Sequence, residues 1–361
     1  MSSFYGLIVS QFLILNFLLA KTTHTSNRKL NFTLKTPELI KNHGYQVEIH
    51  NIVTEDGYIL EIHRLPYGRI NGERNFKNAK RPVLIQHGLA GSSADWILMG
   101  PERALAYMLA DAGYDVWLGN NRGNIYSRNH ISMLPTERYF WNFSYHELGI
   151  YDIPATIDYI IHQTNCKQIF YIGHSQGTTQ FWVAMSQKPD YNAKIKLMIG
   201  LAPVAFTGNL RGPITKLAKL TYMGVMNLTS IMNHVPAGAS WKQLVHFGQG
   251  YIYPDNFRQF DYGNDEKNYR IYNSVQPPKY ELNKIIAPIA LFSSNDDLLA
   301  TKTDVNLLKN KLGNLIFHKE IFIKSFSHYD FLWGPSSISV IFKPILDLLV
   351  FYEQNPLHVL Y

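Results

Sequence analysis

A serine flanked by two glycines lies where a buried strand is expected to run into a helix. Residues 169–177 read IFYIGHSQG and are followed by TTQFWVAMSQ, so Ser175 stands two positions from both Gly173 and Gly177. A tight strand–turn–helix exposes the serine hydroxyl, and the flanking glycines let the strand and the helix approach closely. The pentapeptide alone occurs by chance in many proteins, but in this setting it predicts a nucleophilic serine.

Candidates for the two partners of this serine lie further along the chain. A serine hydroxyl is a weak nucleophile until a histidine accepts its proton and a carboxylate orients that histidine. After such a turn the acid and then the base are expected, each following a later strand. The strand-like run IALFSS is followed by Asp296 and Asp297, and the last predicted strand leads to His328. We therefore expect His328 to be the base. The two adjacent carboxylates are not separated by physical reasoning alone.

Backbone N–H groups that could stabilise an oxyanion are expected at two places. Preorganised donors of this kind usually supply a large part of the catalysis in acyl transfer. One should come from Gln176, directly after the nucleophile, and the other from Leu89, which follows His87 and Gly88 after the early strand PVLIQ. His87 precedes the serine, which is the wrong order for the base, so we interpret it as structural.

Metal and cofactor chemistry have no support in the sequence. The 14 histidines show no spacing typical of a zinc site, and there is a single cysteine, Cys166. The stretch 119–123 (GNNRG) lacks the glycine spacing and the lysine of a phosphate-binding loop, so a turn is the better interpretation. We expect no metal site.

The elements around these residues predict a mostly parallel sheet with helices on both faces. Residues 44–64 alternate apolar and polar side chains around the turn Glu55-Asp56-Gly57, which predicts a hairpin. From Pro82 onward, continuous apolar runs alternate with helical stretches as far as Pro203, and the alternation resumes over 286–352. Such runs are typical of parallel strands that are buried on both faces, which indicates an α/β fold.

An insertion separates the two halves of this pattern. Residues 205–285 are rich in Tyr, Asn, Gly and Pro and lack clean strands. The sequence thus predicts a core made of residues 21–204 and 286–361, with 205–285 inserted as a cap.

The N-terminus predicts secretion. Residues 1–20 contain an interrupted apolar stretch, too short for a comfortable membrane span, and are interpreted as a signal peptide. An uncleaved membrane anchor is the alternative. Glycosylation sequons at Asn31, Asn142 and Asn227 agree with secretion, with the lysosome as the alternative destination.

The charge indicates little beyond this. The formal net charge is +7, but no run of basic residues occurs, which argues against a nucleic-acid partner.

Together these segments resemble one family. The chain resembles the acid lipases, that is gastric lipase, lysosomal acid lipase and their insect relatives, over nearly the whole mature chain. The resemblance rests on GYQVEIHNIVTEDGYILEIHRLPYGR, QHGLAGSSADW, LADAGYDVWLGNNRGN, YDIPATIDYI, GHSQGTTQ, LAPVA, NDDLLA and SHYDFLWG.

The resemblance implies a fold, a site and a reaction. It implies the α/β-hydrolase fold and a triad of Ser175, Asp297 (the aspartate directly before Leu-Leu-Ala) and His328, with Leu89 and Gln176 as the oxyanion hole. It also implies hydrolysis of neutral lipid esters, triacylglycerols or sterol esters, at an oil–water or membrane interface. The reaction would pass through an acyl-enzyme and need no cofactor.

The chain departs from the family pattern in the cap. By the resemblance, roughly fifty residues of this water-excluding insertion are missing between Gly212 and Val235, together with the family's cap cysteines. The shortened cap keeps open a second hypothesis, a catalytically impaired relative that binds or carries lipid.

Overall fold

One sheet runs through the part of the chain that the structure describes. The computed structural model describes residues 34–69, 81–212, 215 and 238–355. The sheet has nine strands in the order β1-β2-β4-β3-β6-β7-β8-β9, with β5 paired to β2. The strands are β1 (Glu48–Val53), β2 (Tyr58–Leu65), β3 (Pro82–Gln86), β4 (Asp115–Leu118), β5 (Asn129–His130), β6 (Ile169–His174), β7 (Ile195–Leu201), β8 (Ile289–Ser294) and β9 (Leu315–Ile321).

The sheet is antiparallel at one edge and parallel elsewhere. Strands β1 and β2 form the hairpin predicted for residues 44–64, and β2 also pairs antiparallel with β4 and with β5. Along the order β4-β3-β6-β7-β8-β9, each pair of adjacent strands is parallel. The predicted fold class, a mostly parallel sheet with helices, is confirmed.

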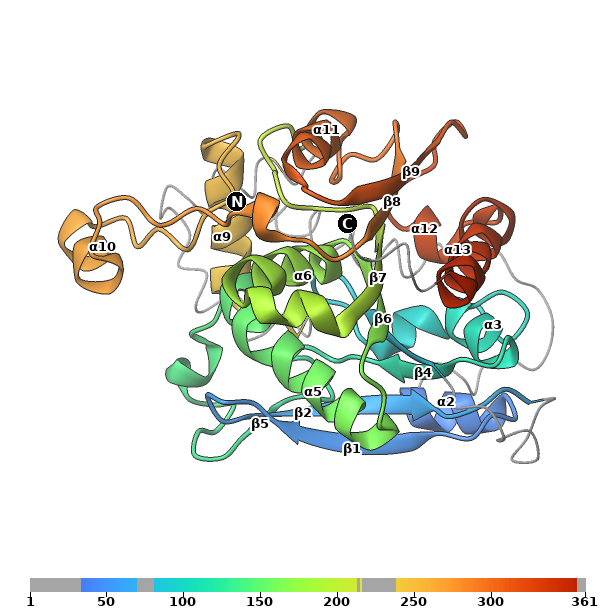
Figure 1. The fold of residues 1–361 in the computed structure, drawn as a ribbon. Helices are drawn as coiled ribbons and strands as arrows, with labels where there is room; N and C mark the ends of the chain where they lie inside the picture. Colours follow the sequence, from blue (N-terminus) through green and yellow to red (C-terminus); the bar gives the residue numbers. More distant parts are fainter. Residues whose placement is uncertain (1–33, 70–80, 213–214, 216–237, 356–361) are drawn as a thin grey trace, which may run out of the picture.

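Helices cover both faces of the sheet (Figure 1). Helices α3 and α13 lie on one face, and α5 and α6 on the other. The helices are α2 (Thr36–Asn42), α3 (Leu105–Asp111), α4 (Tyr145–Glu147), α5 (Ile153–Thr164), α6 (Gln176–Gln187), α9 (Trp241–Ile252), α10 (Asp265–Tyr272), α11 (Lys302–Lys311), α12 (Asp330–Trp333) and α13 (Lys343–Gln354). Short 3-10 turns include η3 (Ser93–Trp96), and π-helical turns precede α5 and α13.

Burial on both faces of the sheet explains why the central strands have continuously apolar sequences. Successive residues of a strand point to opposite faces. In β3, Val83 and Ile85 pack into the core beneath α3 and α13, whereas Leu84 packs into the core beneath α5 and α6. A strand that is buried on both faces has no solvent-facing positions for polar side chains, so its sequence is mostly apolar, as in the run PVLIQ of β3.

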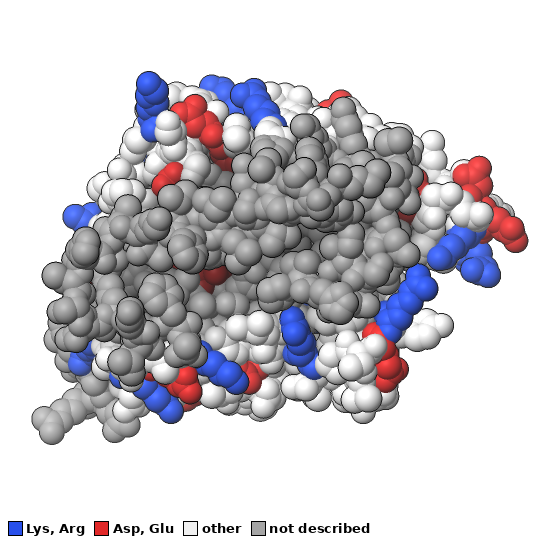
Figure 2. Space-filling model, turned by 180° about the vertical axis from the view of Figure 1, so that it is seen from behind, with Lys and Arg blue, Asp and Glu red and all other residues white. Residues whose placement is uncertain are grey.

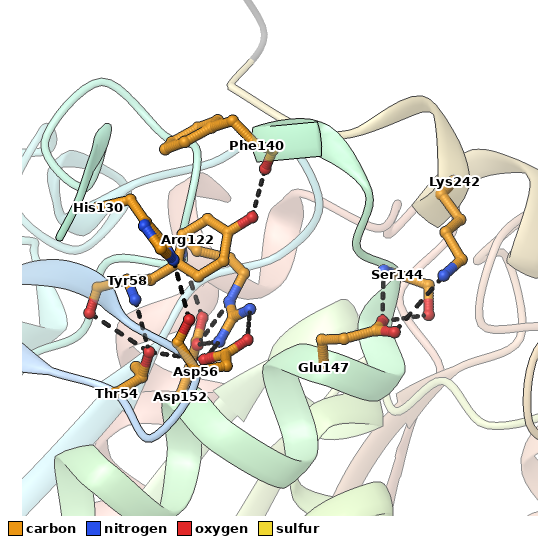
Figure 3. A network of polar contacts seen from close by, with 10 residues as sticks. All are labelled: Thr54, Asp56, Tyr58, Arg122, His130, Phe140, Ser144, Glu147, Asp152 and Lys242. Atoms are coloured by element: carbon orange, nitrogen blue, oxygen red, sulfur yellow. Dashed lines mark hydrogen bonds and ion pairs between the residues drawn. The ribbon is translucent and has the colours of Figure 1, made fainter. Parts of the chain in front are cut away.

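A buried arginine joins three segments behind the sheet edge (Figure 3). The Arg122 side chain is 1% exposed. Its Nε donates to Asp152 Oδ1 at 2.7 Å, and its Nη1 and Nη2 donate to the two oxygens of Asp56 at 2.5 and 2.8 Å. The guanidinium also lies 4.0 Å from the ring centre of Tyr58. Burial lowers the pKa of Arg122, but the two carboxylates outweigh it and hold that pKa above its ordinary value.

Removing this guanidinium should destabilise the fold. Arg122→Met leaves Asp56 and Asp152 close together with no cation between them, and we expect a loss of about 3–5 kcal/mol in the free energy of unfolding. Urea unfolding at pH 7 measures it. Lys194→Met is the control, because Lys194 pairs with Asp158 at a half-exposed site and such pairs contribute under about 1 kcal/mol. Equal losses in the two variants would contradict the assigned role.

The segment inserted between β7 and β8 is described in part. Its described residues form α9 and α10, and α9 packs against α4. Lys242, 3% exposed, lies 3.5 Å from Glu147, which also accepts hydrogen bonds from Ser144 (Figure 3). Burial raises the pKa of Glu147, but the positive charge of Lys242 is the first of several contributions that outweigh it and lower that pKa to about 2.

A neutral histidine completes this contact. The ring of His246 stacks on Tyr145 with 3.7 Å between ring centres, and its Nε2 donates to the carbonyl oxygen of Arg258 at 2.9 Å. Burial lowers the pKa of His246 to about 3. The ring therefore stays uncharged at pH values where an exposed histidine takes up a proton.

Stability should depend on pH through His246. In the unfolded chain this histidine takes up a proton near its ordinary pKa of 6.5, while the folded ring does so only near 3. The unfolded state therefore binds more protons between these values, and the free energy of unfolding falls as the pH falls from 6.5 toward 3. His246→Gln should lose about 1–3 kcal/mol less than wild type between pH 7 and pH 4 in urea unfolding. His162→Gln, at an exposed position on α5, should follow the wild-type slope. An unchanged slope in His246→Gln would refute the assignment.

Several predictions lie outside the described residues. The proposed signal peptide (1–20), the sequons at Asn31 and Asn227, and most of the shortened stretch between Gly212 and Val235 are among them. The third sequon residue, Asn142, is described and is exposed to solvent.

Figure 2 shows one face of the molecule. On the face seen in Figure 2, Lys and Arg side chains lie in separate places around the margin, several of them beside Asp or Glu. Among the helices that the structure describes, none has the length and apolar character needed to span a membrane.

Candidate active site

Ser175 occupies a strained turn between β6 and α6. Its backbone has φ 54° and ψ −120°, a conformation that residues other than glycine rarely adopt. The N–H of Ser175 donates to the carbonyl oxygen of Leu201 at the end of β7, at 3.0 Å. Strain of this kind persists only where the surrounding structure enforces it, and it is common at functional sites.

The two flanking glycines are required by packing. A Cβ at Gly173 would lie 2.8 Å from the backbone of Gly177, and a Cβ at Gly177 would lie 2.3 Å from the carbonyl oxygen of Gln86. Both distances are shorter than Cβ atoms tolerate. The start of α6 therefore packs directly on the end of β3, as the predicted strand–turn–helix requires.

The predicted acid and base lie beside Ser175. The Oγ of Ser175 is 2.7 Å from Nε2 of His328, and Nδ1 of His328 is 2.8 Å from Oδ2 of Asp297. A carboxylate can only accept, so the ring proton is on Nδ1, and Nε2 accepts the hydroxyl proton of Ser175. Ser175, Asp297 and His328 follow the parallel strands β6, β8 and β9, whose carboxyl ends lie at the same edge of the sheet.

Asp297 is held as a buried carboxylate. It is 1% exposed, and its Oδ1 accepts the backbone N–H groups of Leu299 at 2.8 Å and Ala300 at 2.9 Å. Burial raises the pKa of Asp297, but the neighbouring His328 and these backbone donors outweigh it and hold that pKa below its ordinary value. The group is therefore an anion that orients and can stabilise a protonated imidazole.

The adjacent Asp296 points elsewhere. It is exposed and accepts the backbone N–H of Ser325 at 2.5 Å. The structure thus brings Asp297, and not Asp296, to the histidine.

The predicted oxyanion donors also lie at this turn. A Cβ added to Gly88 would lie 3.1 Å from the Cβ of Ser175, so the loop that carries Leu89 passes directly beside the nucleophile. Gln176 is the first residue of α6, where a backbone N–H has no partner inside the helix. Among the hydrogen bonds of the described residues, none uses the N–H of Leu89 or of Gln176.

The sequence did not reveal a role for the buried histidine directly before Ser175. His174 is 1% exposed, and its Nε2 donates to the backbone carbonyl oxygen of His328 at 2.9 Å. Burial lowers the pKa of His174 to about 3, so the ring is neutral, and its hydrogen bond holds the backbone of His328. Its position in a buried strand directly before Ser175 indicated a buried side chain. Its hydrogen-bond partner, His328, could not be predicted because it lies far away in the sequence.

The residues that the structure describes contain no candidate metal site. No group of three or more His, Cys, Asp or Glu side chains there is arranged to hold a metal ion.

Comparison with known proteins identifies the family. A model of a partial α/β-hydrolase lipase region matches residues 36–100, and a model of the α/β-hydrolase fold matches residues 81–235. Gastric triacylglycerol lipase of Bos taurus is 35% identical, over 88% of this chain and 91% of the relative. The chain belongs to the acid lipase family. Its similarity extends to the human lysosomal acid lipase/cholesteryl ester hydrolase, at 33% identity over 89% of this chain and 92% of that one.

Other relatives agree with this membership. Lipase 3 of Drosophila melanogaster is 37% identical, over 88% of this chain and 93% of the relative. Among solved structures, a putative lipase from Acinetobacter baumannii superimposes with a TM-score of 0.54 at 15% identity, covering 92% of this chain and 100% of that one. A putative aryl esterase from Burkholderia cenocepacia gives 0.52 at 14% identity, covering 85% and 100%. These two show the α/β-hydrolase fold, and the resemblance stated from the sequence is confirmed.

The two neighbouring aspartates provide a matched test of the site. Asp297→Asn should slow phosphonylation of Ser175 by a fluorophosphonate by roughly 10²–10⁴-fold, because the amide no longer holds His328 in the tautomer that accepts the serine proton. The rate is measured as loss of free Ser175 by intact-mass spectrometry. Asp296→Asn removes the same charge one residue away and should leave the rate near wild type. Equal slowing by both variants would argue against this arrangement.

Proposed function

We propose that this chain is a lipase that hydrolyses the carboxylic ester bonds of neutral lipids, triacylglycerols or sterol esters. The hydrogen-bonded row from Asp297 through His328 to Ser175 at the strained turn is the observation that carries the proposal. Membership in the acid lipase family supports it, since the relatives are named for triacylglycerol and cholesteryl ester hydrolysis.

Acylation begins at the serine. Ser175 Oγ attacks the ester carbonyl carbon as His328 Nε2 takes up the hydroxyl proton, which gives a tetrahedral intermediate with a negatively charged oxygen. The backbone N–H groups of Leu89 and Gln176 are free to bind that oxygen. The protonated His328 then gives its proton to the departing alcohol oxygen, and an acyl-enzyme remains on Ser175.

Deacylation repeats these steps with water. His328 removes a proton from a water molecule as that water attacks the acyl carbonyl, and the proton passes to Ser175 Oγ as the fatty acid leaves. Asp297, whose pKa is held below its ordinary value, stays ionised and stabilises the imidazolium in both halves of the reaction.

The inserted residues 205–285 are proposed as the cap of this site, on a core of residues 21–204 and 286–361. The packing of α9 on α4 through Lys242 and His246 supports a fixed attachment of this cap to the core. A cap shapes the acyl pocket and excludes water from it. The length of the cap therefore decides which esters are accepted at an oil–water or membrane interface.

Secretion is proposed as the destination, with the lysosome as the alternative. The predicted signal peptide over residues 1–20 and the exposed sequon residue Asn142 support entry into the secretory pathway. The relatives include both gastric and lysosomal enzymes.

The test compares wild type with Ser175→Ala on triacylglycerol emulsions. Hydrolysis of short- and long-chain emulsions is followed between pH 4 and pH 8 by release of fatty acid. We expect the variant to lose activity by a factor on the order of 10⁴–10⁶, because it lacks the nucleophile.

Each outcome has a distinct meaning. Long-chain turnover that disappears in the variant establishes a lipase with a sufficient cap. Turnover of short, soluble esters alone would restrict the enzyme to an esterase. A folded wild type with no activity would overturn the proposal and favour a lipid carrier.

A further inference from the structure

His87 lies beneath the loop that carries Leu89. It follows β3 directly and is 1% exposed. Its Nδ1 is 2.7 Å from the carbonyl oxygen of Gly88, and its Nε2 is 3.1 Å from the backbone nitrogen of Asn121. These two contacts involve opposite sides of the ring, so the ring bridges the loop and the segment that follows β4.

The contacts determine which ring nitrogen carries the proton. A backbone N–H can only donate, so Nε2 of His87 accepts from Asn121 and is unprotonated. A carbonyl oxygen can only accept, so Nδ1 carries the proton and donates it to Gly88. Burial lowers the pKa of His87 to about 4, which keeps the ring neutral and in this form near neutral pH.

Buried side-chain amides surround the Nε2 side of the His87 ring. The side chain of Gln86 donates to Oδ1 of Asn121 at 2.6 Å, and Nδ2 of Asn124 lies 3.3 Å from Nε2 of His87. Asn124 also donates to Oδ1 of Asn120 at 2.8 Å. The direction in which Nδ1 of His87 points is therefore set by a network and not by the one contact with Gly88.

The contact with Gly88 also fixes the direction of a second group. The carbonyl of Gly88 and the N–H of Leu89 belong to one planar trans peptide unit, in which the two bonds point in opposite directions. The Gly88 oxygen is held on one side by His87 and by the N–H of Gly91 at 3.2 Å. The N–H of Leu89 must then point away from His87, on the loop that passes beside Ser175.

We propose that His87 is a positioning residue for the reaction: by donating from Nδ1 to the Gly88 carbonyl, it aims the N–H of Leu89 at the oxyanion. The inference rests on the proposed function and deepens it. A donor that is oriented before the reaction costs no reorganisation when charge develops, which is the source of oxyanion stabilisation. His87 itself does not touch the substrate.

Two amide substitutions separate this role from a structural one. The side-chain nitrogen of asparagine can replace Nδ1 of histidine, so His87→Asn keeps a donor toward Gly88 and loses the acceptor for Asn121. Glutamine reaches the position of Nε2, so His87→Gln keeps an acceptor for Asn121 and loses the donor toward Gly88. Each variant gives up one hydrogen bond, so a purely structural role predicts similar effects.

The readout is the kinetics of p-nitrophenyl butyrate hydrolysis at pH 7. We expect kcat of His87→Gln to be about 10–100-fold below that of His87→Asn with KM nearly equal, because an oxyanion donor acts in the transition state and not on the bound ester. Equal kcat values in the two variants, or a difference confined to KM, would overturn the proposal. Activity of the wild type in the same assay tests the proposed function separately.

A measurement on the wild-type protein does not depend on how the variants fold. Nitrogen-15 NMR of histidine-labelled protein distinguishes a ring protonated on Nδ1 from one protonated on Nε2. The proposal requires the Nδ1–H form for His87. Finding the Nε2–H form would refute it, even if both variants failed to fold or the wild type did not turn over the ester.

Discussion

The backbone conformation of Ser175 is the constraint on which the site depends. A positive φ at a residue with a side chain is unfavourable by itself, so the surrounding packing must hold it. Two strands enforce this backbone conformation. The N–H of Ser175 is hydrogen-bonded to Leu201 of β7, and Gly177 packs against β3 with no room for a methyl group. The same packing brings the loop of Gly88 and Leu89 alongside the serine. One steric arrangement therefore places both the nucleophile and the proposed oxyanion donors.

The histidines around this turn differ in what their surroundings allow. The ring of His328 is hydrogen-bonded to the Asp297 carboxylate and to the Ser175 hydroxyl, the contacts that the proposed base requires. His87 contacts backbone groups and a side-chain amide, and His174 contacts the backbone carbonyl of His328. Burial lowers the pKa of His87 and of His174 far below that of an exposed histidine, so both rings are neutral.

Much of the fold could be predicted from the sequence, and so could the proximity of Ser175 and His328, because their signals are local. The run IFYIGHSQG identifies the turn, and continuous apolar strands identify a sheet buried on both faces. The choice between Asp296 and Asp297 was not local: it depends on which side chain faces a loop that begins far along the chain, and only the family resemblance favoured Asp297. The roles of His174 and His87 depend likewise on backbone groups of distant segments. The GNNRG stretch was predicted as a turn, which did not reveal the buried partners of Asn121 and Arg122.

The Arg122 cluster has a consequence for the register of the β1–β2 hairpin. Arg122 lies in the loop after β4, and Asp152 is the last residue of the π-helical turn before α5. The two side chains form a buried ion pair. Asp56 lies in the turn of the β1–β2 hairpin, and its 26% exposed carboxylate binds the same guanidinium. A hairpin that pairs out of register would leave the Asp56 carboxylate away from its cation, so charge balance selects the correct register at this edge of the sheet.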